Sequence, residues 1–359
     1  MHGAEAVMLR AIKACAARGS RITVLVPSIV ADEGLREALA EINGIQILAL
    51  PYRAAGGHKL RTALVRLYNS VTLFKLIRFV RKEKVNTIYS NTSVTVLGAN
   101  LARRTNIRHI WHWHESVDAA FGWHPSLQAL YRRLARRAET LICISHQQQR
   151  EWEVALGTTL TNAQVIYNPI KQISSIQSDK SAQREGIRIG YIGRFEPRKN
   201  IPLLMHAFEQ LHSTHPHMSL WLCGAIDDKD WRYISGMTAL QNPDVVILPQ
   251  TPDVNLFYQS IDLLVIPSWR ETMPLVALEA MQAGVCVLQT TKSGMAELLE
   301  NNKETLFFSP DNPNELIRLL QKCTDETYRQ SIAKAGQAKA ARLAKEQQFD
   351  QQIQTILCE

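Results

Sequence analysis

Short apolar runs separated by longer amphipathic segments recur along the whole chain. Buried strands of parallel sheets are continuous apolar runs, whereas helices between them repeat apolar residues every three to four positions. The pattern therefore predicts an α/β fold with parallel sheets. The expected strands are 22–26, 45–48, 87–89, 108–111, 141–144 and 164–166 in the first half, and 187–192, 219–223, 245–248, 263–266, 285–288 and 305–308 in the second.

The strand pattern stops near the middle of the chain and then starts again. A chain of 359 residues is too long for one ordinary core. Residues 171–186 are polar and rich in Ser, Gln and Lys, which is typical of a linker. We therefore predict two Rossmann-like, doubly wound parallel-sheet domains facing a cleft, at 1–170 and 187–340. A C-terminal helix at 341–359 is expected to pack back on the N-terminal domain.

The beginning of the chain departs from this plan. Gly3 is followed at once by a helical pattern at 6–18. In a nucleotide-binding unit, such a glycine normally follows a strand. The first strand of a doubly wound sheet is central, and its absence would leave unpaired backbone in the core. We expect either a true start upstream or a shortened form.

Residues 267–284 connect two of the apolar runs and contain one predicted helix. Thr272 suits an N-cap, Pro274 suits the first turn, and Gly284 suits the end of the helix. The helix is apolar nearly all round, which predicts that it is buried.

Two carboxylates lie eight positions apart in this stretch. Glu271 is in the loop, and Glu279 is inside the buried helix, where an unpaired charge would be very costly. The pair would bracket an extended polar ligand whose anionic part lies at the amide-rich helix start. The alternative is that Glu271 is solvated and Glu279 pairs with a core arginine.

Cationic residues follow the first strand of the second domain. Gly193 permits a tight turn at the carboxyl end of this strand, where open α/β sheets bind ligands. Arg194 and Lys199 both suit phosphate, although a surface turn with two solvated cations is the alternative. Pro249 follows another strand end, in line to hold a flat base through backbone groups.

A histidine-rich segment, 108–116, runs off a strand of the first domain. Alternation places His112 and His114 on one face, and Glu115 follows. A His–carboxylate pair would transfer a proton or orient an acceptor hydroxyl. A metal site is disfavoured because no Cys or Asp completes a set of ligands with the two histidines. The other alternative is that the histidines only pack in the core. We predict a site facing the interdomain cleft.

The charge is divided unequally between the halves. Residues 1–186 carry a net charge of +12, and residues 187–359 carry −4. Such a basic half favours an anionic partner. The basic segments 71–81 and 131–137 suit a membrane surface, or are core helices with a cationic outer face. In 71–81, the apolar face is predicted to hold Leu73, Phe74, Leu76, Ile77 and Val80, opposite Lys75, Arg78 and Arg81. Nucleic acid is disfavoured because no recognition motif is present.

The remaining composition indicates a reducing cytoplasm. The six cysteines are scattered without a CxxC pair, and several lie in apolar runs. No apolar run is long enough to span a membrane, and the chain start lacks the features of a signal peptide.

Motifs in a fixed order identify a resemblance that covers about 310 residues. The chain resembles retaining glycosyltransferases of family GT4, which have the GT-B fold. The matching segments are 2–5, 90–92, 113–115, 143–145, 165–169, 193–195 with 199–200, Glu271-x7-Glu279, 306–308 and 310–313.

The resemblance implies a metal-independent, retaining hexosyl transfer from a UDP- or GDP-sugar, without a cofactor. Arg194 and Lys199 would hold the donor diphosphate next to Gly193, and Glu279 would bind the ribose hydroxyls. Glu271 would lie by the donor sugar. The backbone N–H groups around 273–276 would support that contact, namely those of Met273, Leu275 and Val276. His114 would lie near the reacting centre and the acceptor.

The expected setting is surface-polysaccharide synthesis on a lipid-linked or glycan acceptor, at the inner face of the cytoplasmic membrane. Thr272 and Pro274 replace glycines that are frequent in the family, and Pro274 removes one N–H donor. The alternatives are a nucleotide-sugar epimerase on the same fold and a truncated, inactive binding protein. The sugar, the base and the acceptor are not encoded in the motifs.

Overall fold

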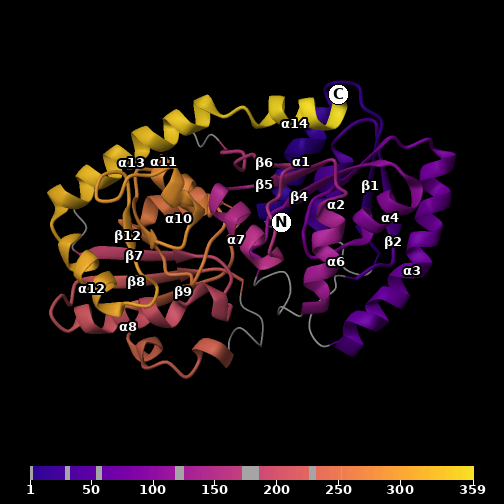
Figure 1. Cartoon of the computed structure of the whole chain (residues 1–359). Helices are drawn as coiled ribbons and strands as arrows, with labels where there is room; N and C mark the ends of the chain where they lie inside the picture. Colours follow the sequence, from indigo (N-terminus) through magenta and orange to yellow (C-terminus); the bar gives the residue numbers. More distant parts are fainter. Residues whose placement is uncertain are drawn as a thin grey trace. The chain divides into compact units, whose positions relative to one another are not determined.

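The computed structural model describes residues 3–28, 33–53, 59–117, 125–171, 186–225, 232–251 and 253–359. The chain forms two compact α/β units (Figure 1). Unit 1 contains 1–169 together with 348–359, and unit 2 contains 170–347. Most of the linker predicted at 171–186 lies outside the described residues.

Unit 2 is built on one parallel sheet. Its strands are β7 (Ile187–Ile192), β8 (Met218–Cys223), β9 (Val245–Leu248), β10 (Leu263–Ile266), β11 (Cys286–Thr290) and β12 (Leu306–Phe308). Their order in the sheet is β12-β11-β10-β7-β8-β9. The chain winds outward from β7 to β9, returns to β10 beside β7, and winds outward the other way. This confirms the doubly wound sheet, and its topological switch point lies between β7 and β10.

The helices of unit 2 cover this sheet and close its core. They are η1 (Pro197–Lys199), α8 (Ile201–His212), η2 (Thr238–Gln241), α10 (Val254–Ser260), α11 (Leu275–Gln282), η3 (Gly294–Glu297), α12 (Pro313–Lys322) and α13 (Glu326–Glu346). The core joins strand residues such as Ile189 and Leu220 to Leu204 and Phe208 of α8. Helix α13 continues past residue 340, so the predicted boundary there was too early.

The start of α11 differs from the sequence prediction. Pro274, not Thr272, is the N-cap residue, and the helix begins at Leu275. Two backbone hydrogen bonds explain the later start: Glu271 N–H donates to Lys292 O, and Gly294 N–H donates to Glu271 O. They hold the loop extended beside the segment after β11. The proline also disfavours helical backbone at the residue before it.

Unit 1 contains two separate parallel sheets. One pairs β1 (Ile22–Pro27) with β2 (Ile45–Leu50). The other has the order β3-β4-β5-β6 and is formed by β3 (Thr87–Ser90), β4 (Arg108–Trp113), β5 (Thr140–Cys143) and β6 (Ala163–Val165). Within the described ranges, no strand joins β1 to β3. The sequence predicted that a central strand is missing from this domain.

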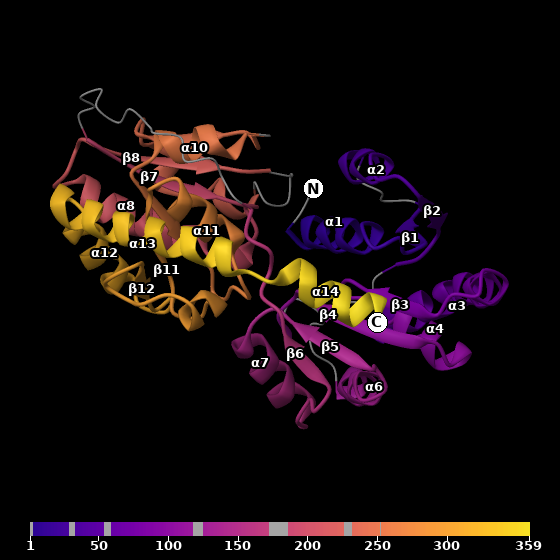
Figure 2. The same ribbon diagram turned by 90° about the horizontal axis from the view of Figure 1, so that it is seen from above.

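The helices of unit 1 are α1 (Gly3–Ala16), α2 (Glu33–Ala40), α3 (Lys59–Lys82), α4 (Leu97–Thr105), α6 (Pro125–Ala135), α7 (His146–Leu156) and α14 (Phe349–Cys358). The last of these packs along α1, as Figures 1 and 2 both show. Phe349 and Ile353 join Val7 and Ala11 in one buried cluster. None of the described helices combines the length and hydrophobicity needed to span a membrane.

Helix α3 does not divide its faces as the sequence suggested. Leu73, Leu76 and Val80 are buried against α4, as expected for the apolar face. Phe74, which was assigned to that face, is 54% exposed. The reason is helical geometry: Phe74 lies one position from the buried Leu73, or about 100° around the axis.

Candidate functional site

Two loops meet at the switch point of unit 2. Strands β7 and β10 are direct neighbours, with Ile189 opposite Leu263. Gly193 follows β7, and the 267–284 stretch follows β10. Gly193 has φ +151°, and a Cβ on Gly224 would lie 1.9 Å from Gly193 O. Only glycine allows the backbones after β7 and β8 to approach this closely.

The centre of this site is a buried ion pair. Lys199 Nζ donates to Glu271 Oε1 at 2.6 Å, and Ser268 Oγ donates to the same oxygen at 2.6 Å. The Arg198 guanidinium lies 3.8 Å from Glu271 Oε2. Burial disfavours the charged form of Glu271, but Lys199 and Arg198 outweigh it and lower the pKa of this carboxyl. Glu271 is therefore ionised and is not the solvated loop residue that was the alternative.

Backbone hydrogen bonds fix these side chains relative to one another. Trp269 N–H donates to Arg198 O at 3.1 Å, which joins the loop after β10 to η1. Asn200 adopts φ +51° between η1 and α8. The lysine and the carboxylate are thus held by loops that begin at adjacent strand ends.

Glu279 has a tyrosine partner instead of a core arginine. Tyr258 Oη on α10 donates to Glu279 Oε2 at 2.9 Å. Burial raises the pKa of Glu279, although the tyrosine hydrogen bond and the charge of Lys171 oppose the shift. One carboxylate oxygen is thus held by the protein, and the group lies on the second turn of α11.

The first turn of α11 has no side-chain cap in this described part of unit 2. Ala277 N–H donates to Pro274 O at 3.0 Å, while the N–H groups of Leu275 and Val276 precede any intrahelical acceptor. Met273 is buried just ahead of the helix. The helix start therefore offers donors to an anion between Glu271 and Glu279.

Arg194 and Pro249 complete the set at the strand ends. Arg194 is exposed, and its backbone oxygen accepts a hydrogen bond from Tyr191 Oη at 2.6 Å. Pro249 directly follows β9, and its carbonyl accepts from Cys223 Sγ at 3.4 Å. Every predicted donor-site residue is therefore in unit 2, at the carboxyl edge of its sheet or in the first two turns of α11.

The histidines of unit 1 form a buried network at the end of β4. Tyr89 Oη donates to Asn91 Oδ1 at 2.9 Å and lies 2.7 Å from His112 Nδ1. His114 Nε2 lies 3.0 Å from the same Asn91 oxygen, so this nitrogen carries the proton. Asn91 Nδ2 donates to Ala4 O at 2.8 Å, which ties the network to the start of α1.

The tautomer of His112 follows from this arrangement. The Tyr89 hydroxyl has one proton, so donating it to Asn91 makes the hydroxyl the acceptor for His112 Nδ1–H. His112 Nε2 is then an unprotonated acceptor. It is buried, with no hydrogen-bond partner among the described residues. A ligand hydroxyl that reaches this nitrogen would satisfy it.

The predicted His–carboxylate pair is wrong in one respect. Glu115 accepts hydrogen bonds from Thr92 Oγ1 at 2.6 Å, Ser93 N–H at 2.8 Å and Ser93 Oγ at 2.6 Å. The carboxylate thus closes the loop after β3. Glu115 is next to His114 in sequence, and this position suggested a proton relay. The sequence does not show that the carboxylate is already used as the acceptor for Thr92 and Ser93.

Buried histidines make the stability of the chain pH-dependent. Burial lowers the pKa of both His109 and His114 to about 4, from 6.5. Each therefore stabilises the fold fully above about pH 6.5, and this contribution is lost as the pH falls towards 4. At pH 5 the expected loss is about 2 kcal/mol per histidine.

His109→Gln tests this relation away from the network, because His109 Nε2 contacts only Ser90 Oγ at 3.0 Å among the hydrogen bonds seen for it. We expect the unfolding temperature of the variant to fall less than that of the wild type between pH 7 and pH 5. Thermal melts across this range provide the measurement. Parallel curves for the two proteins would contradict the assignment.

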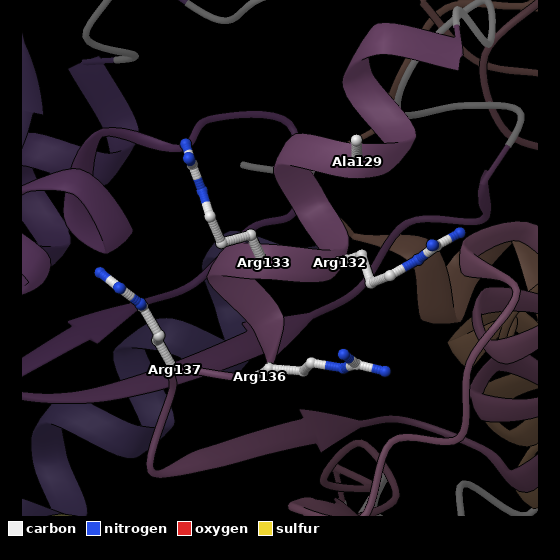
Figure 3. Close-up of a pocket in the computed structure, with 5 residues that line it drawn as sticks. All are labelled: Ala129, Arg132, Arg133, Arg136 and Arg137. Carbon is white, nitrogen blue, oxygen red and sulfur yellow. The ribbon is translucent and has the colours of Figure 1, made fainter.

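A cationic cavity lies elsewhere in unit 1. Its volume is about 350 Å³, and it is lined by Ala129, Arg132, Arg133, Arg136 and Arg137. Figure 3 shows Arg132 and Arg136 extending to one side of α6, and Arg133 and Arg137 to the other. Arg132 Nε donates to Leu156 O at 2.6 Å, and Arg136 donates to Thr158 Oγ1 at 2.7 Å. Arg132 and Arg136 therefore hydrogen-bond to the end of α7 and to the turn that follows it.

Several site residues were missed by sequence reasoning. Ser268 lies inside the predicted stretch, and Arg198 directly precedes Lys199, so proximity was a usable signal for both. Tyr258 gave only a weak signal in the sequence, which is that a buried tyrosine hydroxyl needs a hydrogen-bond partner. Asn91 was noted as part of a motif, without its role in joining the histidines to α1. Within the described residues, no group of three or more His, Cys, Asp or Glu side chains is placed to hold a metal ion.

The comparison with protein families agrees with this division. Residues 2–169 match the family described as Glycosyl transferase 4-like domain. Residues 173–339 match Glycosyl transferases group 1. The two halves of the chain are thus each similar to a glycosyltransferase domain. The doubly wound sheet and the strand-end site of unit 2 thus lie within the residues that match Glycosyl transferases group 1.

Individual relatives support the same conclusion. The chain is 24% identical over 320 residues to an uncharacterized glycosyltransferase of Haemophilus influenzae, covering 88% of this chain and 85% of the relative. It is 26% identical over 172 residues to the capsular polysaccharide biosynthesis glycosyltransferase CapM of Staphylococcus aureus, covering 46% and 43%.

A solved structure shows the same GT-B fold. The Anabaena protein HepE in complex with UDP has a TM-score of 0.80 and 21% identity, with 99% of this chain and 96% of that chain covered. WaaG, a glycosyltransferase involved in lipopolysaccharide biosynthesis, has a TM-score of 0.68 and 16% identity, with 99% and 95% covered.

Proposed function

We propose that this protein transfers a hexosyl group, with retention, from a UDP- or GDP-sugar to a lipid-linked or glycan acceptor. The product would belong to a surface polysaccharide. The observation that carries the proposal is the juxtaposition of Lys199, Glu271 and the start of α11 at the switch point of unit 2. The UDP complex of the similar Anabaena protein and the polysaccharide-related names of other relatives support it.

The donor would lie along the loops at the strand ends. Its diphosphate would contact Arg194, Lys199 and the N–H groups of Leu275 and Val276. The ribose hydroxyls would donate to Glu279, whose second carboxylate oxygen is held by Tyr258. The base would lie by the backbone at Pro249, and the sugar by Glu271.

The transfer breaks the bond between the sugar and the diphosphate, which leaves as an anion. Preorganised cations and N–H groups stabilise such developing charge without reorganisation, and this is a large term in catalysis. Arg194 and Lys199 would supply it from the protein itself, so we propose that no metal or cofactor is required.

The acceptor would be recognised by unit 1. His112 Nε2 offers a buried acceptor to a hydroxyl, and His114 lies beside it with ring centroids 4.0 Å apart. Because burial lowers the pKa of both rings, they are neutral at pH 7. We propose that this pair orients the attacking hydroxyl. The basic character of unit 1 supports peripheral association with an anionic cytoplasmic membrane.

Donor binding is tested by thermal shift with UDP, GDP, ADP and their sugars. A ligand at 100 times its Kd stabilises the protein by about 2.7 kcal/mol, which is readily measured. We expect UDP or GDP to raise the unfolding temperature. Stabilisation by none of them would contradict the proposal, and turnover of the donor without an acceptor would favour an epimerase.

Glu279→Gln locates the ribose contact. We expect nucleotide affinity to fall about tenfold, since a charge-assisted hydrogen bond to the ribose is lost. Tyr258→Phe is the matched control, because it removes the protein partner of Glu279 and keeps the carboxylate. Calorimetric titration with the nucleotide measures both. Equal affinity in wild type and Glu279→Gln would remove the ribose assignment.

A further inference from the structure

The outer face of α3 carries an exposed apolar stripe. Leu67, Val71 and Phe74 are 71%, 62% and 54% exposed. They are spaced four and three residues apart, so they lie on one side of the helix. The other exposed large hydrophobic side chains of the described residues are Ile47, Val154, Leu256 and Trp269, which are far apart in sequence. Single exposed apolar residues are ordinary, whereas an aligned set indicates a binding surface.

Cations continue the same face towards the end of the helix. Lys75, Arg78, Arg81 and Lys82 are exposed, and α3 contains no Asp or Glu. The Arg78 guanidinium lies 4.2 Å from the centre of the Phe74 ring. Apolar and cationic side chains are therefore intermixed, and the face is complementary to a partner that is both apolar and anionic.

The opposite face anchors the helix. Leu73, Leu76 and Val80 pack against Leu97 and Leu101 of α4. Asn69 bonds the backbone of Arg53 twice, at 3.0 Å and 2.9 Å. The exposed face is thus presented on a fixed helix.

Neighbouring elements widen the surface. Helix α4 lies beside α3 in Figures 1 and 2, and its last turn carries the exposed Arg103 and Arg104. A cavity of about 230 Å³ opens between α3, α4 and α6, and its lining includes Ser70, Leu97 and Arg104. The cationic side chains are therefore not confined to one helix.

We propose that the outer face of α3 docks on the surface of an anionic lipid bilayer. Leu67, Val71 and Phe74 enter the headgroup region, and the four cations contact lipid phosphates. A bilayer supplies both kinds of contact over the whole length of the helix, because acyl chains and phosphates lie side by side along its surface. The inference rests on the proposed function in one respect: it assigns the membrane association of unit 1 to specific residues.

The test is flotation of the full chain with lipid vesicles. Vesicles of phosphatidylcholine alone are compared with vesicles containing phosphatidylglycerol at a ratio of about 7:3. We expect binding only to the anionic vesicles and a loss of binding at high salt. Val71→Ser/Phe74→Ser and Lys75→Gln/Arg78→Gln should each reduce the bound fraction about tenfold.

Two control variants match these changes. Val154→Ser removes a valine that is 82% exposed on α7 of the same unit. Arg133→Gln/Arg137→Gln removes two exposed arginines, one on α6 and one in the turn that follows it. Both should bind vesicles as the wild type does. Wild-type binding by the α3 variants, or loss of binding only in the α6 variant, would overturn the proposal.

Self-association is the other occupant to exclude. If the wild type is a dimer in solution that Val71→Ser/Phe74→Ser dissociates, and if no vesicle binding is seen, the face is a protein interface and the proposal is wrong. Thermal shift with UDP accompanies every variant. An α3 variant that binds nucleotide normally but does not float with vesicles supports membrane binding through α3. If the wild type itself does not bind nucleotide, only the proposed function is contradicted.

Discussion

Arg194→Ala is expected to reduce turnover roughly 100- to 1,000-fold, the loss typical when one preorganised group that stabilises developing charge is removed. Arg194 directly follows Gly193 at the switch point, on an exposed part of the loop. Lys199, the other cation, is hydrogen-bonded to Glu271, which balances part of its charge. Lys199 is therefore expected to compensate only in part for the loss of Arg194.

The kinetic pattern distinguishes this role from simple binding. A group that stabilises the transition state more than the bound donor affects kcat more than nucleotide affinity. Turnover is measured with the sugar nucleotide identified by thermal shift, and affinity by calorimetry with the nucleotide alone. Arg318→Ala, at an exposed arginine of α12 in the same unit, is the control and should be neutral. Turnover near the wild-type value would remove the assignment.

The strands of this protein were predictable because buried parallel strands are continuous apolar runs. The bounds of β7, β9 and β10 agree with the sequence prediction residue for residue. The switch point followed from the alternation of strands and helices, and it indicated the correct edge of the sheet. The helix start at Leu275 was not predictable in the same way, because backbone hydrogen bonds to Lys292 and Gly294 decide it.

Contacts between side chains of distant elements were outside the reach of the sequence. Lys199 and Glu271 are 72 positions apart, and both were expected in the donor site without a direct bond between them. Tyr258 on α10 donates a hydrogen bond to Glu279 on α11 across 21 positions of the sequence. Phe74 is exposed because helical geometry and the packing of α3 on α4 rotate it away from its buried neighbours. In each case, tertiary packing supplied information that spacing lacks.

The second large effect is expected from Lys199→Met. It leaves the Glu271 carboxylate, 7% exposed, without its nearest cation. Breaking a buried pair in this way costs about 3–5 kcal/mol, or roughly 10 °C in unfolding temperature for a unit of this size. Ser268 and Arg198 still contact the carboxylate, which keeps the cost within that range. Thermal melts of the full chain measure the change in unfolding temperature.

The double variant Lys199→Met/Glu271→Gln should recover part of this loss. It removes the buried charge as well as its partner, so the two effects are not additive and couple by about 1–3 kcal/mol. The pH dependence gives a second test. The depressed pKa of Glu271 stabilises the wild type above about pH 4.3, and that contribution is lost as the pH falls through the folded value. In Lys199→Met, burial instead favours the protonated acid, so the two stability curves converge in acid. Parallel curves would show that the ion pair is not the cause.

Glu271→Gln alone separates the structural role of the carboxylate from its proposed contact with the sugar. The substitution frees Lys199 from its anionic partner, and the lysine at 20% side-chain exposure can then reach a diphosphate more easily. Affinity for the free nucleotide, which lacks the sugar, should be unchanged or higher. Turnover should still fall, because the group beside the donor sugar has lost its charge. If instead both affinity and turnover fall together, Glu271 acts only by holding Lys199 in place, and the sugar contact must be assigned to another residue.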